Sequence, residues 1–275
     1  MTEKFQHKKS LGQHFLNSDF VPKKMCDAAG LTPGRRSNLR PGGEVVLEIG
    51  PGTGILTAEI LKRGASVVAI EADARAITSL QETFANEIAT GQLTIYHHDA
   101  RALNLAEFGL VDQQFKIIAN IPYYISGLLF RLCLESDIQP TNLVFLVQRE
   151  VAARIARDVK SSILSMSVRV YGDPTYVDTI KRGHFTPPPA VDSAIVAVND
   201  INRSRLQGIV EADFFTALHA AFGQKRKQLA GNLAPLFGKQ SVVTALIKLD
   251  LPADVRAEDL TTRAFVDLLL LLSAK

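Results

Sequence analysis

Short apolar segments recur along the first part of the chain, and the stretches between them have the length of helices. The β-like segments are Val45–Ile49, Val67–Ile70, Leu93–Tyr96, Phe115–Ala119 and Leu143–Val147. Segments such as Thr53–Arg63 and Asp73–Ala89 lie between them, and each opens near a residue that caps helices. Strands that alternate with helices predict a parallel sheet with helices on both faces.

The pattern changes in the second part of the chain. Thr175–Ile180 and Ala194–Val198 have no helix between them, which predicts an antiparallel pair at one edge of the sheet. Their linker, KRGHFTPPPAVDS, contains consecutive prolines and is expected to be stiff and extended. Beyond it only helical patterns remain: Glu211–Phe222, Lys225–Leu236, Val242–Ile247 and Glu258–Ser273. We therefore expect an α/β domain over residues 1–200 and a small all-helical domain over residues 201–275.

Charge is distributed unevenly on an otherwise ordinary globular composition. The chain of 275 residues is 47% hydrophobic and carries a net charge of +3. Lysine and arginine gather near the N-terminus, at Lys4, Lys8, Lys9, Lys23 and Lys24, and again within residues 222–239. Such segments are either solvated faces or a footprint for phosphate groups, and charge alone does not decide between them.

Cysteine content and hydropathy bear on the compartment. Cys26 and Cys133 lie far apart in apolar surroundings, which indicates buried thiols in a reducing compartment and neither a metal cluster nor a disulfide. The first residues lack the apolar core of a secretory signal, and Leu268–Leu272 is too short to span a bilayer. We expect a cytoplasmic protein without membrane contact.

Glycines follow the first predicted strand directly. The stretch EIGPGTG places Gly50, Gly52 and Gly54 there, and Ile55 stands where the dinucleotide fingerprint needs its last glycine. The resulting G-x-G-x-G spacing after Glu48 is typical of methyltransferases that use a nucleoside cofactor. Glycines let the backbone turn sharply and approach a ligand closely, so we expect the pocket at the carboxyl ends of the strands.

Carboxylates end the next two strands. Glu71 can accept hydrogen bonds from ribose hydroxyls, and Asp99 is placed to accept one from the amino group of an adenine. Each carboxylate alone is a common surface feature, whereas the glycine loop with both of them indicates a nucleoside-type cofactor. His97 and His98 are adjacent on a strand and point to opposite faces, so no metal site is predicted.

The fourth strand ends in NIPYYIS, a cluster without an acid, a base or a thiol. An adenine amine is a poor nucleophile but a good hydrogen-bond donor. The Asn120 side-chain oxygen and the Ile121 carbonyl, held by Pro122, can accept its N–H groups and favour a tetrahedral nitrogen. Tyr123 offers a ring on which a base can stack, worth roughly 1–3 kcal/mol. The motif thus predicts methyl transfer to a nucleobase amine. The role of Tyr124 stays open, with packing as the default.

These motifs together resemble the ribosomal RNA adenine N6,N6-dimethyltransferase family over nearly the whole chain. They are KKSLGQHFLN at 8–17, EIGPGTGILT at 48–57, IEAD at 70–73, HHDA at 97–100, NIPYYIS at 120–126, QREVAARI at 148–155, FTPPPAVDSA at 185–194 and FGQKRKQLAGNL at 222–233. The most similar branch is the bacterial one, whose enzymes dimethylate two adjacent adenosines in the 3′-terminal hairpin of small-subunit (16S) ribosomal RNA. The resemblance implies a Rossmann-like class I methyltransferase sheet, a role in ribosome biogenesis, and a monomer.

The resemblance also implies roles for individual residues. The contacts to S-adenosylmethionine are assigned to His14, Leu16, Gly50, Gly52, Glu71, Asp99 and Asn120. The catalytic set is Asn120, Ile121, Pro122, Tyr123 and Phe185. Phe185 would close the second face of the target adenine, with its ring fixed by the stiff Pro187–Pro189 loop. Lys225, Arg226 and Lys227 in the helical domain would bind RNA phosphates, and no metal is expected.

The sequence departs from the family pattern at three places, and it is compatible with more than one function. His14 stands where asparagine is usual, Ala190 where lysine is usual, and Ala230–Gly231 in a segment that is usually more polar. One alternative is an enzyme that methylates large-subunit ribosomal RNA and confers antibiotic resistance. Another is a ribosome assembly factor in which catalysis is secondary. A DNA adenine methyltransferase is disfavoured because no additional target-recognition segment is evident.

Overall fold

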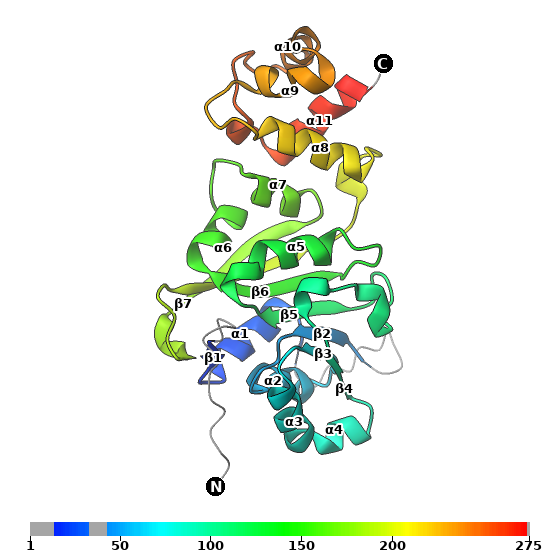
Figure 1. The fold of residues 1–275 in the computed structure, drawn as a ribbon, viewed down its shortest axis with the longest axis vertical. Helices are drawn as coiled ribbons and strands as arrows, with labels where there is room; N and C mark the ends of the chain where they lie inside the picture. Colours follow the sequence, from blue (N-terminus) through cyan, green and yellow to red (C-terminus); the bar gives the residue numbers. More distant parts are fainter. Residues whose placement is uncertain (1–13, 33–42, 274–275) are drawn as a thin grey trace. The chain divides into compact units, whose positions relative to one another are not determined.

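The computed structural model describes residues 14–32 and 43–273, and its main feature is a seven-stranded sheet (Figure 1). The strands of this sheet are β2 Val45–Ile49, β3 Ser66–Glu71, β4 Leu93–His97, β5 Lys116–Asn120, β6 Asn142–Gln148, β7 Asp173–Ile180 and β9 Ser193–Asn199. Their order across the sheet is β4-β3-β2-β5-β6-β9-β7. The strands from β2 to β6 pair in parallel, and β9 runs antiparallel to β6. The last two predicted strands therefore lie at one edge, as expected.

Helices cover both faces of this sheet, as the apolar pattern predicted. Those of the first unit are α1 Phe20–Ala28, α2 Ile55–Lys62, α3 Ala74–Thr83, α4 Ala85–Ala89 and α5 Ser126–Leu134, and α6 Arg149–Ala156 begins in it. The helices that belong to the second compact unit are α7 Ile163–Arg169, α8 Glu211–Ala221, α9 Leu229–Phe237, α10 Lys239–Lys248 and α11 Thr262–Ser273. Side chains alternate along a strand, so neighbours on β6 face opposite sides. Phe145 packs edge-on against Phe130 of α5, with ring centroids 5.0 Å apart. Val144 and Leu146 belong instead to the core cluster that contains α1.

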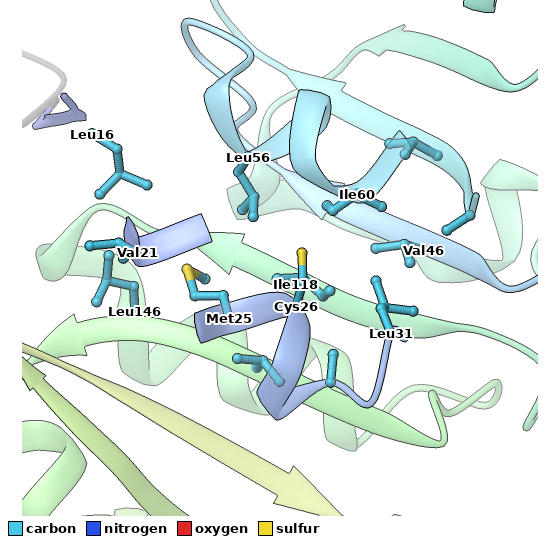
Figure 2. Close-up of a cluster of buried hydrophobic side chains, with 14 of the residues drawn as sticks. Leu16, Val21, Met25, Cys26, Leu31, Val46, Leu56, Ile60, Ile118 and Leu146 are labelled. Carbon is cyan, nitrogen blue, oxygen red and sulfur yellow. The ribbon is translucent and has the colours of Figure 1, made fainter. Parts of the chain in front are cut away.

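In the core on the α1 side, side chains of α1, of α2 and of the sheet pack together (Figure 2). Met25 and Cys26 of α1 are fully buried between the strand residues Val46 and Ile118 and the α2 residue Ile60. Both cysteines of the chain are free and buried, which confirms the predicted buried thiols. Desolvation raises the pKa of the Cys26 thiol to about 12, so this thiol is unreactive at neutral pH.

Some helix boundaries differ from the prediction. The segment Asp73–Ala89 was expected to be one helix, but it breaks at Phe84, whose backbone leaves the helical region at φ −114° and ψ 32°. The buried Phe84 ring lies against Gly54, where an added Cβ would come within 2.7 Å of it. Helix α9 begins at Leu229, so the basic residues Lys225–Lys227 form part of the preceding turn. None of the helices in the described part of the chain combines the length and apolar character needed to cross a bilayer.

The described chain forms two compact units. The first comprises the described residues up to 152 and residues 175–201, and the second comprises residues 153–174 and those from 202 onward. The prediction placed a single boundary at residue 200, and the units differ from it because residues 153–174 pack with the C-terminal helices. Ser161 donates from its backbone N–H to the Glu258 carbonyl at 2.7 Å, and the Tyr171 hydroxyl donates to the Glu211 carboxylate.

Candidate active site

A cavity of about 180 Å³ opens at the carboxyl ends of the central parallel strands. Strand order reverses between β2 and β5, and in open α/β sheets ligands bind at such a switch point. Gly50 directly follows β2 and Asn120 ends β5, and both line the cavity. The predicted site residues that line it are His14, Gly50, Gly52, Glu71, Asp99, Asn120, Ile121, Pro122 and Tyr123. Residues far apart in the sequence therefore share one cavity.

Leu16 and Phe185 lie in the core and are not among the residues that line this cavity. The short strand β1, Phe15–Leu16, pairs antiparallel with β8, Phe185–Thr186, and places Leu16 opposite Phe185. The two side chains are only 6% and 2% exposed. Because side chains alternate along a strand, Phe15 and not Leu16 faces the cavity.

Two glycines of the loop after β2 adopt left-handed backbone conformations. Gly50 has φ 69° and Gly52 has φ 56°, a region that residues with a Cβ rarely adopt. Nothing lies within 4 Å of the position that a Cβ on Gly50 would occupy, so its backbone borders open space. A Cβ on Gly52 would come within 2.8 Å of the Phe15 ring. One glycine thus leaves room for a ligand, and the other leaves room for β1.

Glu71 ties the glycine loop to the end of β3. Its Oε2 accepts from the backbone N–H of Gly52 at 3.1 Å. Its Oε1 accepts from the N–H groups of Ala72 and Asp73 at 2.8 and 2.9 Å. The side chain is 6% exposed and lines the cavity. Backbone donors therefore fix the carboxylate in place, and its remaining lone pairs are available to ligand hydroxyls.

Asp99 follows β4 and is held by Arg101. The Arg101 side chain donates to both carboxylate oxygens, with an Nη2–Oδ2 distance of 2.5 Å, and its backbone N–H donates to Oδ1 at 2.9 Å. These hydrogen bonds lower the pKa of Asp99 to about 2. The carboxylate is ionised at neutral pH, so both of its oxygens can accept hydrogen bonds from an amino group.

Glu48 lies beneath the glycine loop, 1% exposed. The Thr57 hydroxyl donates to its Oε2 at 2.7 Å, whereas its Oε1 has no hydrogen-bond partner among the described residues. Desolvation raises the pKa of Glu48 to about 8, and the nearby Glu71 carboxylate adds to this shift. Glu48 therefore holds a proton in the folded protein at neutral pH.

The raised pKa makes the folded protein less stable as the pH rises. Between the ordinary pKa of 4.5 and the folded value of about 8, the unfolded chain releases the Glu48 proton and the folded chain keeps it. The free energy of unfolding then falls by about 1.4 kcal/mol per pH unit from this group. We expect Glu48→Gln to remove this slope, so that its stability relative to wild type improves from pH 5 to pH 8.

Urea unfolding at pH 5, 6.5 and 8 measures this difference. The buried amide that Gln creates shifts stability by a similar amount at each pH, so only the slope reports the titration. Glu82→Gln, at an exposed position, is the control and should follow wild type. Parallel pH profiles for Glu48→Gln and wild type would contradict the raised pKa.

The N-terminal segment orients the Asn120 amide. Asn120 Nδ2 donates to the backbone carbonyl of His14 at 3.1 Å. The His14 Nδ1 in turn lies 2.9 Å from the Pro187 carbonyl, to which it donates. With its nitrogen engaged, the amide presents its oxygen as the acceptor toward a ligand.

Tyr123 is held on two sides. Its hydroxyl lies 2.5 Å from the Ser193 Oγ, and burial raises its pKa above the ordinary value. Its ring stacks near that of His14, with centroids 5.7 Å apart and planes inclined by 26°. Pro122 has φ −59° and ψ 132°, which turns the chain out of β5 into the short 3₁₀ turn Tyr123–Ile125. The ring of Tyr123 is therefore fixed at the cavity wall.

The cavity is also lined by residues to which the sequence assigned no role in it, among them Phe15, His98, Arg101 and Tyr124. The alternation of side chains along a strand is a sequence signal that would have placed Phe15 at the cavity and Leu16 in the core. Arg101 carries no such signal, because its pairing with Asp99 appears only in the folded chain. The structure contradicts the default assignment of Tyr124 to packing, since this side chain is 62% exposed.

The basic residues of the helical unit lie beside a cavity of their own. Lys225, Arg226 and Lys227 are exposed. Lys225 and Lys227 border a cavity of about 600 Å³ that Arg154 and Lys160 also line. The Lys227 side chain lies over Gly231, where an added Cβ would come within 2.7 Å of its Cε. Asn232 Nδ2 donates to the carbonyl of Ala221 at the end of α8 at 2.6 Å and to that of Gln224 in the turn at 3.1 Å. The departure at Gly231 therefore has a packing role.

The other basic positions differ in their surroundings. Lys23 pairs with Asp19 at 2.5 Å, and Lys24 pairs with Asp178 at 2.5 Å. Ala190, which stands where lysine is usual, lines a cavity together with two arginines, Arg149 and Arg182. The remaining lysines predicted as part of the N-terminal basic segment, Lys4, Lys8 and Lys9, lie outside the described residues.

Known proteins match this chain over almost its full length. The family described as ribosomal RNA adenine dimethylase matches residues 4–273. A ribosomal RNA small subunit methyltransferase A from Dehalococcoides mccartyi is 40% identical over 257 residues, which cover 92% of this chain and 84% of that protein. Its counterpart from Fusobacterium nucleatum is 32% identical, with 96% and 97% covered.

Solved structures agree on the fold. A dimethyladenosine transferase from Plasmodium falciparum aligns with a TM-score of 0.76 at 25% identity, covering 94% of this chain and 96% of that one. The 23S rRNA methyltransferase ErmE aligns with a TM-score of 0.74 at 22% identity, covering 94% and 99%. The Rossmann-like class I methyltransferase fold with a helical C-terminal part is thereby confirmed. The chain belongs to the ribosomal RNA adenine dimethylase family, whose methyl donor is S-adenosylmethionine.

Proposed function

We propose that this protein dimethylates the N6 amines of two adjacent adenosines in the 3′-terminal hairpin of small-subunit ribosomal RNA. The observation that carries the proposal is the orientation of Asn120, whose nitrogen is engaged by His14 so that its oxygen is presented in the cavity. The relatives named as small-subunit methyltransferases support the choice of RNA. We infer from these relatives that the activity takes place in the bacterial cytoplasm, as part of ribosome biogenesis.

The residues around the cavity fit S-adenosylmethionine. Gly50 leaves open space where a Cβ would stand, and the ionised Asp99 can accept from the adenine amino group. We assign Glu71 to the ribose hydroxyls, because its carboxylate is fixed and lines the same cavity. His14 and Gly52 complete this part of the wall. When bound, S-adenosylmethionine supplies a methyl carbon activated by its positively charged sulfur.

In the proposed reaction the protein positions the amine and needs no strong base. The Asn120 side-chain oxygen and the Ile121 carbonyl accept the two N–H bonds of the adenosine amine, which frees the nitrogen lone pair. The nitrogen becomes acidic once it is alkylated, so its proton leaves to water. Pro122 holds the Ile121 carbonyl in place, and Tyr123 stacks on the base. Positioning and acceptor electrostatics carry the catalysis.

Phe185 has a different role in this proposal than the sequence suggested. Its ring is 2% exposed and pairs with Leu16 across β1 and β8. From that place Phe185 anchors β1, which holds Phe15 and the preceding residue His14 at the cavity. We therefore assign Leu16 and Phe185 to positioning, and neither to direct contact with cofactor or base.

We further propose that the helical unit binds RNA phosphates. We also propose that the protein acts as a monomer. Lys225, Arg226 and Lys227 are exposed on its surface, and Arg154 and Lys160 line the adjacent cavity. Contacts of this kind position an RNA without reading its sequence, and their strength falls with salt. The target adenosine must leave its stack to enter the cavity of the first unit.

The glycine loop offers a test of the cofactor assignment. We expect Gly52→Ala to weaken binding of S-adenosylmethionine at least tenfold, because the new Cβ would collide with the Phe15 ring and push β1 from the cavity. Gly64→Ala is the matched control, since Gly64 also has a positive φ, 83°, but nothing lies within 4 Å of its Cβ position. Calorimetric titration measures both affinities. Equal loss in the two variants would contradict a collision at β1.

The substrate is tested by mapping the methylated nucleotides. Purified protein and labelled S-adenosylmethionine are incubated with small and large ribosomal subunits from a strain that lacks both modifications. We expect label in small-subunit RNA, at two adjacent adenosines of the 3′-terminal hairpin, located by mass spectrometry of RNA fragments. Label in large-subunit RNA alone would favour the activity named for ErmE. Tight binding to small subunits without transfer would favour an assembly factor.

A further inference from the structure

Tyr124 stands out as an aromatic ring at the mouth of the cavity. It lies in the 3₁₀ turn Tyr123–Ile125, where about three residues complete a turn, so consecutive side chains point in different directions. Ile125 is 7% exposed and Tyr123 is half-buried, whereas Tyr124 is 62% exposed. It is the most exposed of the phenylalanine and tyrosine side chains in the described part of the chain. The turn thus sends two side chains inward and one ring outward.

Arg101 lies on the same rim. It belongs to the 3₁₀ turn Ala100–Ala102, which contacts α5 directly after the Tyr124 turn, and both side chains line the cavity. Asp99 engages its Nε and Nη2, which leaves the N–H groups of Nη1 as donors. The pKa of Arg101 is raised, mainly by its hydrogen bonds to Asp99, and the nearby Tyr124 side chain adds to this shift. A cation fixed at Nε and Nη2 is therefore near an exposed aromatic ring.

The two groups together select the chemistry of a ligand. An apolar ligand would use the ring and not the Nη1 donors that Asp99 leaves open, and a free anion would use those donors and not the ring. A nucleotide uses both, since its base can stack on a phenol and its phosphate can accept from a guanidinium. Stacking does not depend strongly on which base is present.

We propose that Tyr124 and Arg101 form a subsite for the nucleotide that flanks the target adenosine. Its base stacks on Tyr124 and its phosphate accepts from Arg101, while the target base is inside against Tyr123. The proposal rests on the proposed RNA methylation and adds a second contact to it. It gives Tyr124 a role in substrate binding, in place of packing.

A cycle of protein and RNA changes tests the stacking contact. The full chain is assayed with a hairpin RNA that contains the target adenosines and with the same RNA carrying an abasic site at the flanking position. We expect Tyr124→Ala to raise KM for the intact RNA by about 5- to 150-fold, the fold-change that corresponds to one stacked base, with affinity for S-adenosylmethionine unchanged. Tyr124→Phe and Tyr124→Trp should stay within about threefold of wild type, because both keep a ring.

The abasic RNA distinguishes stacking from a general defect. Removing the flanking base should raise the KM of wild type by the same factor as Tyr124→Ala raises it on the intact RNA. The KM of Tyr124→Ala should not rise further on the abasic RNA. Phe20→Ala, at an aromatic ring that is 44% exposed away from the cavity, is the control and should keep the wild-type KM. If the KM effects of Tyr124→Ala and of the abasic site multiplied when combined, the subsite would be overturned and the proposed function would stand. Failure of wild type to methylate the intact RNA would instead overturn the proposed function.

Discussion

Replacing Asn120 with alanine is expected to lower the rate of methyl transfer by about 10²–10³-fold, the usual effect of removing one preorganised hydrogen-bonding group from a reacting centre. The alanine has no side-chain oxygen to accept from the adenosine amine. Affinity for S-adenosylmethionine should stay within about threefold of wild type, since Glu71, Asp99 and the glycine loop remain. Single-turnover rates and calorimetric titration measure the two quantities separately.

Asn120→Asp separates the two functions of this amide. The aspartate keeps an acceptor oxygen but cannot donate to the His14 carbonyl, to which Asn120 Nδ2 donates at 3.1 Å. We expect it to transfer methyl groups faster than Asn120→Ala and more slowly than wild type. An alanine variant that keeps more than a tenth of the wild-type rate would show that the acceptor is not needed. Equal loss of cofactor binding would show that Asn120 acts mainly on the cofactor.

Replacing Glu71 with glutamine is expected to weaken cofactor binding by about 10- to 100-fold although the side chains have almost the same shape. Both carboxylate oxygens accept from backbone N–H groups, Oε2 from Gly52 and Oε1 from Ala72 and Asp73. Either orientation of the glutamine amide turns an NH₂ group toward one of these donors. A buried donor left without an acceptor costs about 1–3 kcal/mol. Here one of the affected donors is the Gly52 N–H of the glycine loop.

Glu59→Gln is the matched control for this substitution. Glu59 is also a buried carboxylate of the first unit, 8% exposed, and accepts from Arg63 Nε at 2.8 Å away from the cavity. We expect it to lower thermal stability while leaving the affinity for S-adenosylmethionine within about twofold of wild type. If both variants lowered affinity equally, the effect of Glu71→Gln would be one of stability and not of the loop.

Local patterns were enough to predict most of the sheet and much of the site. The apolar runs gave strands whose observed bounds differ by two residues or fewer at each end, because burial on both faces selects continuous β-forming segments. The glycine spacing and the ends of three strands located Gly50, Glu71 and Asn120 at one cavity, because parallel strands share a carboxyl edge. These features depend on residues close together in the chain.

What sequence reasoning missed depends on contacts between distant segments. Phe185 was expected on the base, but the register of β1 against β8 turns its ring into the core. Nothing in the spacing of Arg101 reveals that it holds Asp99. Residues 153–174 group with the helical unit through contacts such as Ser161 with Glu258, almost a hundred positions later, which no local pattern reports.

The pairing of β1 with β8 sets the order in which the enzyme becomes competent. His14 and Pro187, 173 positions apart, must both be present before the N-terminal strand has its partner. A nascent chain that has emerged only as far as β7 already carries the glycine loop, Glu71 and Asn120. Its β1 has no partner strand, so the His14 carbonyl that orients Asn120 is not held in place. Methyl-transfer competence therefore comes late in synthesis, after the parallel strands β2 to β6 that carry the site.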